Sequence, residues 1–226
     1  MDPFDRHLDL GCGKFPRNPY ARPILCGIDV RPAPANTDFE HRVANLVVDP
    51  IPYALGEFGS VSAYDFLEHV PRLLTTPDGR DTCFPFIRLM NEIWRVLVPG
   101  GRFYALTPGY PTRDAFTDPT HVNFITERTH EYFCGENPLG RMYGFDGHFR
   151  ALRVEWVDIH DAYSAVAGSP QNRARGAAPS RLAAAFRRLS RRLRGKPPHY
   201  RAPYLLWEFE ALKQGSPPAD ALTISR

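Results

Sequence analysis

The chain has 226 residues, of which 43% are hydrophobic and 23% are charged, a composition typical of a folded domain and unlike that of a disordered or fibrous chain. We expect no membrane span and no signal peptide from its hydropathy pattern, and the four cysteines without C-x-x-C spacing favour reduced thiols in a cytoplasmic protein over a zinc site or disulfides. The net charge of +3 is uneven, because residues 173–196 carry nine Arg and Lys and no acid, which leaves 19 basic and 25 acidic residues elsewhere.

The first element is a short apolar strand that runs into a glycine turn at residues 8–13 (LDLGCG). Gly11 and Gly13 let the backbone turn tightly and come close to a ligand. A second apolar run at 24–29 ends in Asp29, and a carboxylate at the end of a second strand can accept hydrogen bonds from both hydroxyls of a ribose. The two runs together predict a nucleoside-binding half-fold.

The same turn does not match the phosphate site of a dinucleotide. That site requires G-x-G-x-x-G with a helix opening at the glycines, whereas here the third glycine is absent. Pro16, Pro19 and Pro23 also leave little room for a helix between the two strands. The glycine pair by itself could mark only a tight turn.

Residues 43–48 form the next apolar stretch and predict a third strand closed by Asp49. With Asp9 and Asp29, this acid would lie at one edge of a parallel sheet, where ligands bind in open α/β folds. The alternative for the dipeptide 49–50 (DP) is a simple turn.

The middle of the chain continues the alternation of strands and helices. Residues 60–64 predict a fourth strand that enters a helix at 65–70. Residues 84–97 carry apolar side chains at helical spacing, and the helix is expected to stop at 99–101 (PGG). A fifth strand is expected at 103–106.

Three elements follow the fifth strand. Residues 126–133 predict a short helix with Thr126 as its N-cap. Two late strands are expected at 152–159 and 204–212, the second rich in aromatic residues.

An insert at about residues 161–202 separates the two late strands and is too long for an ordinary loop. Within it, residues 180–194 predict a helix with a narrow apolar stripe opposite several arginines. That helix could pack on the domain with its arginines in solvent, lie on an anionic membrane surface, cover a ligand pocket or bind an acidic partner. Residues 214–226 are expected to form a flexible tail.

Alternating strands and helices favour a parallel α/β sheet, and four motifs now resemble a known family. They are 8–13 (LDLGCG), 27–29 (GID), 64–70 (YDFLEHV) and 97–103 (LVPGGRF). In this order and spacing they resemble the class I S-adenosylmethionine-dependent methyltransferases. The resemblance implies a Rossmann-like, mostly parallel seven-stranded sheet with flanking helices, formed by a single domain over residues 1–213 with a helical insert before the last strand.

A narrower similarity rests on 118–121 (DPTH), followed by 124–126 (FIT) and 132–133 (YF). These residues resemble a methyltransferase subgroup found among surface-polysaccharide and secondary-metabolite biosynthesis proteins. One departure is that only six residues precede His7, where most relatives have one or two helices that cover the cofactor.

The resemblance implies S-adenosylmethionine as cofactor, with no metal. It places the cofactor along Asp9, Gly11, Gly13, Asp29, Asp49 and Tyr64. Asp9 would accept from the cofactor's ammonium group, Asp29 from its ribose, and Asp49 would lie near the adenine edge.

Two histidines are candidate general bases, because an acceptor hydroxyl must lose its proton whereas an amine can attack in its neutral form. His69 follows the fourth strand, and His121 lies in the loop after the fifth. The alternative for either histidine is a helix cap or a hydrogen bond to a backbone carbonyl. Asp118 could orient His121 or form a turn before Pro119.

The sequence therefore predicts methyl transfer to oxygen or nitrogen of a small-molecule or glycan acceptor. The alternatives are a protein or RNA methyltransferase and a non-catalytic scaffold, while a nicotinamide dehydrogenase is disfavoured by the missing third glycine. Nucleic acid is an unlikely partner because the basic residues are not interleaved with aromatic ones. We expect a cytoplasmic protein, with peripheral contact to anionic membrane through 180–194 as a further hypothesis.

Overall fold

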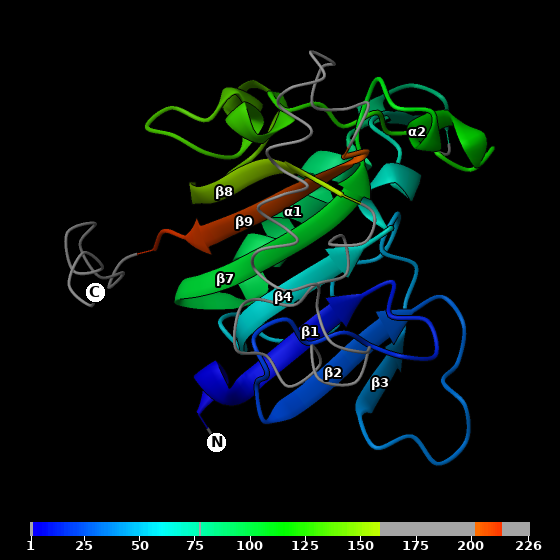
Figure 1. The fold of residues 1–226 in the computed structure, drawn as a ribbon. Coiled ribbons are helices and arrows are strands. Elements are labelled where there is room, and N and C mark those ends of the chain that lie inside the picture. Colours follow the sequence, from blue (N-terminus) through cyan, green and yellow to red (C-terminus); the bar gives the residue numbers. More distant parts are fainter. Residues whose placement is uncertain (1, 77, 159–201, 214–226) are drawn as a thin grey trace, which may run out of the picture.

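A computed structural model describes residues 2–76, 78–158 and 202–213, and its centre is a seven-stranded sheet (Figure 1). The strand order is β3-β2-β1-β4-β7-β9-β8. In chain order the strands are β1 (Arg6–Leu10), β2 (Ile24–Asp29), β3 (Glu40–Val43), β4 (Phe58–Tyr64), β7 (Leu97–Pro108), β8 (Phe149–Val157) and β9 (Tyr204–Ala211).

The sheet is parallel from β3 to β7, and β9 is antiparallel to both β7 and β8. This confirms the expected mostly parallel sheet. All seven residues of the central strand β4 are buried, as expected for a strand covered on both faces, whereas the edge strand β3 is largely exposed. The carboxyl ends of β1, β2 and β4 therefore meet at one edge, which is where the candidate site lies.

One long helix, α1 (Pro85–Val96), covers the face of the sheet that is turned away from the viewer in Figure 1. It starts with proline at its first position and has no side-chain N-cap. Its buried stripe belongs to one core cluster with Leu8 and Val61 of the sheet. The amphipathic helix of the sequence prediction is confirmed, but it ends at Val96, and Leu97 already begins β7.

The opposite face of the sheet is more polar, because the residues of β1 and β4 that alternate with the α1 core include His7, Asp9, Ser60 and Ser62. In β7, Phe103 belongs to the α1 core, whereas Tyr104 packs in a second cluster on the other face. Arg17 lies over the Tyr64 ring at 4.7 Å, and the Tyr20 hydroxyl donates to Glu208 at 2.8 Å. The segment between β1 and β2 therefore covers this face without forming a helix, in keeping with its three prolines.

The third strand was placed too late by the sequence prediction. The structure has β3 at Glu40–Val43, and residues 44–49 form a turn. Asn45 is the cause: its carbonyl accepts from the N–H groups of Val48 and Asp49, and its side chain accepts from Val47.

Two predicted helices are shorter than expected. After β4 only a 3₁₀ turn forms, η2 (Leu67–His69), and the helix expected at 126–133 is a 3₁₀ turn, η3 (Thr129–Tyr132). The residue before η3 is Arg128, which is not a side-chain cap, so the assignment of Thr126 as N-cap is wrong by two positions. Thr126 nevertheless accepts the Arg128 N–H at 3.3 Å.

The remaining described elements are short and lie around the sheet. They are η1 (Pro3–Asp5), β5 (Leu74–Thr75), β6 (Thr82–Cys83), α2 (Asp114–Thr117) and η4 (Leu139–Tyr143). The first late strand, β8, begins three residues earlier than predicted, at Phe149.

Residues 159–201 and 214–226 lie outside the described part of the chain. The predicted insert at 161–202 lies almost wholly there, as do its helix at 180–194 and the predicted tail. Among the residues that the structure describes, no helix is long and apolar enough to cross a membrane.

Candidate functional site

The glycine turn after β1 is open on the side where a ligand would lie. Gly11 and Gly13 both have left-handed backbones, with φ of 64° and 55°, which favour glycine. A Cβ on Gly11 would lie 2.6 Å from the Phe66 ring, whereas a Cβ on Gly13 would have no atom of the described residues within 4 Å. The described part of the chain therefore leaves the backbone of Gly13 uncovered.

Asp29 is the last residue of β2 and closes this turn. Its carboxylate accepts the N–H groups of Gly13 and Arg31, both at 3.0 Å. The side chain is half-buried, and a carboxylate has about four lone-pair sites, so it can accept further hydrogen bonds. Gly13 and Asp29 thus form a rim, with hydrogen-bond acceptor capacity left on the carboxylate.

Asp9 lies beneath the turn and not at its surface. It is 1% exposed, and its oxygens accept from the Ser62 hydroxyl at 2.5 Å and from the Arg17 N–H at 2.8 Å. His7 continues this buried chain, with its ring nitrogens 2.8 Å from the hydroxyls of Ser60 and Ser62. Burial raises the pKa of Asp9 to about 7 and lowers that of His7 to about 3.

Asp49 and Tyr64 are held by contacts other than the Gly13–Asp29 hydrogen bond. The Asp49 carboxylate accepts the Asn45 N–H at 3.0 Å and so closes the turn that follows β3. The arrangement matches the turn alternative for this position. Tyr64 is 3% exposed and lies between Arg17 and the Tyr104 ring, whose centroid is 5.5 Å away.

The structure brings the two candidate bases together. The ring centroids of His69 and His121 are 4.8 Å apart, with the ring planes at 72°. His69 comes from η2 after β4, and His121 comes from the loop after β7. Both rings are half-buried.

Backbone hydrogen bonds lock these two segments together. The N–H groups of Val122 and Asn123 both donate to the Glu68 carbonyl at 2.9 Å. The Asn123 side chain donates to the Leu67 carbonyl at 3.1 Å. Asn123 is 1% exposed, so these bonds are shielded from water and hold His69 and His121 in register.

A hydrogen-bond chain sets the tautomer of His69. The Thr120 hydroxyl donates to Asp118 at 2.6 Å, so its oxygen is left to accept from His69 Nδ1, which is 3.0 Å away. The Thr120 carbonyl also lies 3.3 Å from Nδ1. His121 Nδ1 lies 3.2 Å from the Ala115 carbonyl, which can only accept. In its neutral form each ring therefore carries its proton on Nδ1 and a lone pair on Nε2.

Of the two alternatives for Asp118, a partner of His121 or a turn residue, the structure shows the turn. Asp118 makes the turn, since it accepts the Thr120 N–H at 2.8 Å, and through the Thr120 hydroxyl it reaches His69. Hydrogen bonds from Thr120, with smaller contributions from His121 and His69, lower the pKa of Asp118.

Glu68 lies beside the pair and was not singled out from the sequence. One oxygen accepts from Thr107 at 2.8 Å, and the other is buried without a hydrogen-bond partner among the described residues. Burial raises the pKa of Glu68 to about 8. Atoms of Glu68, His69 and His121 that could bind a metal lie within 4.8 Å of one another, and these three groups could hold a divalent ion if they moved closer together.

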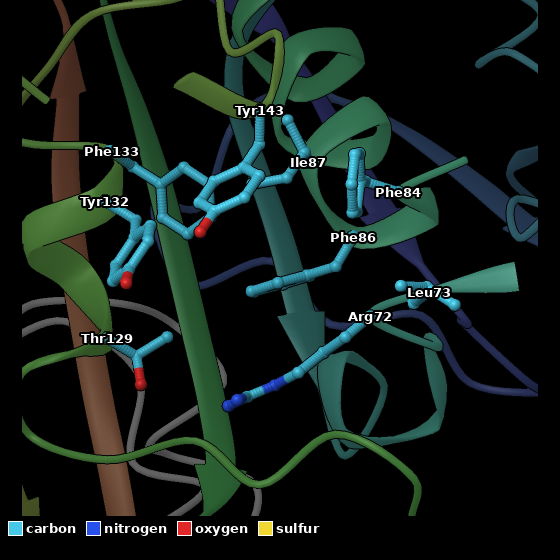
Figure 2. Close-up of a pocket in the computed structure, with 9 residues that line it drawn as sticks. All are labelled: Arg72, Leu73, Phe84, Phe86, Ile87, Thr129, Tyr132, Phe133 and Tyr143. Atoms are coloured by element: carbon cyan, nitrogen blue, oxygen red, sulfur yellow. The ribbon is translucent and has the colours of Figure 1, made fainter. Parts of the chain in front are cut away.

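Two adjoining pockets extend from the loops that carry the histidines. One has a volume of about 290 Å³ and the other about 570 Å³, and both are lined by Arg72, Thr129 and Tyr132. Figure 2 shows the first, with aromatic side chains around the space and the guanidinium end of Arg72 reaching toward Thr129. Arg72 was not identified as a site residue from the sequence, because nothing in its local pattern signals a pocket.

No family model matches the chain, and no curated protein matches it. Among solved structures it resembles a chain in the complex between the Haloferax volcanii Trm112 methyltransferase activator and the putative methyltransferase, with TM-score 0.52 and 14% identity over 92% of this chain and 83% of that one. The fold is that of the class I methyltransferases. Weaker likenesses include SAM-dependent methyltransferases from Methanosarcina mazei (TM-score 0.49, 15% identity, 94% of each chain) and Archaeoglobus fulgidus (0.48, 14%, 91% and 85%).

In this methyltransferase fold the glycine turn and Asp29 lie where the first two strands end, and the histidine pair lies past the ends of β4 and β7. The rim and the pair come from neighbouring strands of one sheet, because β1 pairs with β2 and with β4, and β4 pairs with β7.

Proposed function

We propose that the protein transfers a methyl group from S-adenosylmethionine to an oxygen or nitrogen of a small-molecule or glycan acceptor. The observation that carries this proposal is the open Gly13–Asp29 rim on the same sheet edge as the His69–His121 pair. A nucleoside rim alone would suit many ligands. A proton-accepting pair beside it suits a reaction at the far end of a bound nucleoside.

The cofactor-binding residues have different tasks in this proposal. The backbone at Gly11 and Gly13 lies along the amino-acid part of the cofactor, and Asp29 accepts from the ribose hydroxyls. Asp9 acts from below by holding Arg17 and the turn, rather than by touching the ligand. Tyr64 supports the same segment through Arg17, and Asp49 shapes the chain after β3 near the adenine edge.

The cofactor supplies an electrophilic methyl group, and the protein's part is to hold the acceptor in line and to take its proton. Positioning can contribute about 7–11 kcal/mol to such a step. His69 and His121 present Nε2 lone pairs, and either can accept the proton of an acceptor hydroxyl. The chain Asp118–Thr120–His69 then stabilises the imidazolium that forms.

The DPTH segment gives the narrower family assignment a physical meaning. Asp118, Thr120 and His121 all take part in the histidine pair or its hydrogen bonds. We therefore propose that the chain is related to the DPTH subgroup of polysaccharide and secondary-metabolite biosynthesis. A cytoplasmic location and contact of 180–194 with anionic membrane are proposals that rest on the sequence alone.

Calorimetry with S-adenosylmethionine, S-adenosylhomocysteine and NADH tests the proposed function. We expect the two sulfur nucleosides to bind and NADH not to bind. Asp29→Ala should weaken binding by about 2–3 kcal/mol, because hydrogen bonds to a charged group are lost. Asp38→Ala, at an exposed acid beyond β2, is the matched control and should bind as the wild type does. Wild-type affinity in Asp29→Ala would remove the nucleoside rim from the proposal.

A further inference from the structure

The two pockets share one wall, and neither lining includes His69 or His121. Arg72 and Tyr132 line both, so a ligand that fills them would contact both side chains. Their volumes, about 290 and 570 Å³, are in the range of small-molecule sites. This groove is formed by residues after β4 and after β7, which are the segments that also carry His69 and His121.

Partly exposed aromatic rings border the groove. Tyr132 and Tyr143 are stacked with their centroids 6.3 Å apart, and 36% and 42% of their surfaces are exposed. Phe124 is 37% exposed and stacks on Phe116 at 4.7 Å. Exposed aromatic rings of this kind are suited to stack on another planar ring or on the apolar C–H face of a sugar.

Arg72 adds a positive charge that the described residues do not neutralise. Its guanidinium donates to the Asn123 side chain at 2.7 Å and to the Phe124 carbonyl, both uncharged, and no ion pair joins it to an acid in the described part of the chain. Arg128 in the larger pocket differs, because it is paired with Glu131 at 2.9 Å. The two hydrogen bonds fix the fork of Arg72 while leaving its charge available.

The hydrogen bond between Arg72 and Asn123 links the groove to the two segments that carry the histidine pair. Arg72 follows His69 by three residues, and its partner Asn123 follows His121 by two. A molecule anchored at Arg72 is therefore positioned by the segments that hold the two bases.

We propose that the methyl acceptor lays a ring on Tyr132 and presents an anionic group, a carboxylate or a phosphate, to Arg72. This inference rests on the proposed function only in calling the ligand a methyl acceptor. Binding of an anionic ring compound to the groove does not depend on the proposed function. A neutral ligand would leave the guanidinium without a counter-charge, and a cation would be repelled. An anionic ring compound satisfies both the charge and the exposed rings.

Three probes with a common ring test the proposal: 4-nitrophenyl phosphate, 4-nitrophenyl glucuronide and 4-nitrophenyl glucoside. Their binding to the full chain is measured by calorimetry without cofactor. We expect the phosphate, the glucuronide or both to bind about tenfold or more tighter than the neutral glucoside. The two anionic arms distinguish a phosphate from a carboxylate acceptor.

Arg72→Gln should abolish the preference for the anionic probes, whereas Arg80→Gln removes the same charge outside the groove and should keep it. Since Arg72 also braces a loop, Tyr132→Leu provides a second variant that leaves the guanidinium in place. It should weaken all three probes equally. Equal binding of the three probes to the wild type, or an unchanged preference in Arg72→Gln, would overturn the proposal.

Cofactor binding in the same variants separates this inference from the proposed function. Arg72→Gln and Tyr132→Leu should bind S-adenosylmethionine as the wild type does, because neither lies on the Gly13–Asp29 rim. Loss of the anion preference with intact cofactor binding supports the groove. A wild type that binds the anionic probes but not the cofactor would overturn the proposed function and leave the groove as a ligand site.

Discussion

The Thr120 hydroxyl oxygen lies 3.0 Å from Nδ1 of His69, although 51 residues separate them in the chain. The contact joins the DPTH loop to the LEH turn after β4. Through the Thr120 hydroxyl, the exposed Asp118 is also linked by hydrogen bonds to the half-buried His69 ring. The tautomers of His69 and His121 both follow from hydrogen bonds of this kind.

The first prediction is that Thr120→Val changes the tautomer of His69. Valine keeps the shape of threonine but cannot accept from Nδ1, which is then left with only the Thr120 carbonyl at 3.3 Å, so part of the proton population should move to Nε2. Imidazole ¹⁵N chemical shifts measure this without any substrate. Thr117→Val removes a neighbouring hydroxyl that donates to the Arg113 carbonyl, and it should leave His69 unchanged. An unaltered His69 spectrum in Thr120→Val would contradict the hydrogen-bond chain.

The second prediction concerns Gly13. Valine there adds a left-handed strain of about 1–2 kcal/mol and fills the space that the cofactor backbone contact needs. Gly79 has φ of 69° and equally free surroundings but lies in the β5–β6 hairpin, so Gly79→Val carries a similar strain. We expect both variants to lose similar stability in denaturant, and only Gly13→Val to lose S-adenosylmethionine binding by calorimetry. Equal cofactor affinity in the two variants would argue against the glycine turn as a ligand rim.

The third prediction separates acceptor types. For a hydroxyl acceptor, His69→Ala or His121→Ala should lower turnover by about 10²–10⁴ while cofactor affinity is unchanged. His130→Ala is the control, because that ring is bonded to the Glu127 carbonyl outside the pair. Turnover that survives both substitutions would indicate an amine acceptor, which needs no base.

The fourth prediction is a pH dependence of stability caused by Glu68. Its pKa is raised from 4.5 to about 8, mainly by burial, so the folded state favours the protonated form. The stability that protonated Glu68 contributes to the folded state is fully present below pH 4.5. It is lost as the pH rises toward about 8, because deprotonation then places a charge in the core.

Glu68→Gln is uncharged at every pH. The stability of this variant relative to the wild type should therefore be greater at pH 9 than at pH 5, by more than ~1 kcal/mol. Urea unfolding at both pH values measures the difference. Glu127→Gln, at an exposed carboxylate, should give parallel curves with the wild type. Parallel curves for Glu68→Gln would mean that Glu68 is ionised in the folded protein.

Local pattern was sufficient for the frame of the fold. The spacing of apolar residues predicts the strand that ends before Gly11, the strand that ends at Asp29, and the buried apolar stripe of α1. It does so because side-chain direction repeats every two residues in a strand and about every 3.6 in a helix. The prolines between β1 and β2 likewise exclude a helix there by their own geometry. The run at 43–48 shows where pattern fails, since Asn45 turns the backbone with hydrogen bonds that hydrophobicity does not encode.

The site itself was decided by tertiary structure. His69 and His121 could each be selected as bases by residue type, but their 4.8 Å approach depends on the bonds from Val122 and Asn123 to the Glu68 carbonyl. Asp9 has the residue type of a ligand-binding acid, yet the packing of residues 14–22 over the sheet buries it. The chemical type of each residue can be read along the chain. The exposure of a side chain, and its contacts with residues about 50 positions away, depend on how the loops pack, and only the folded molecule determines them.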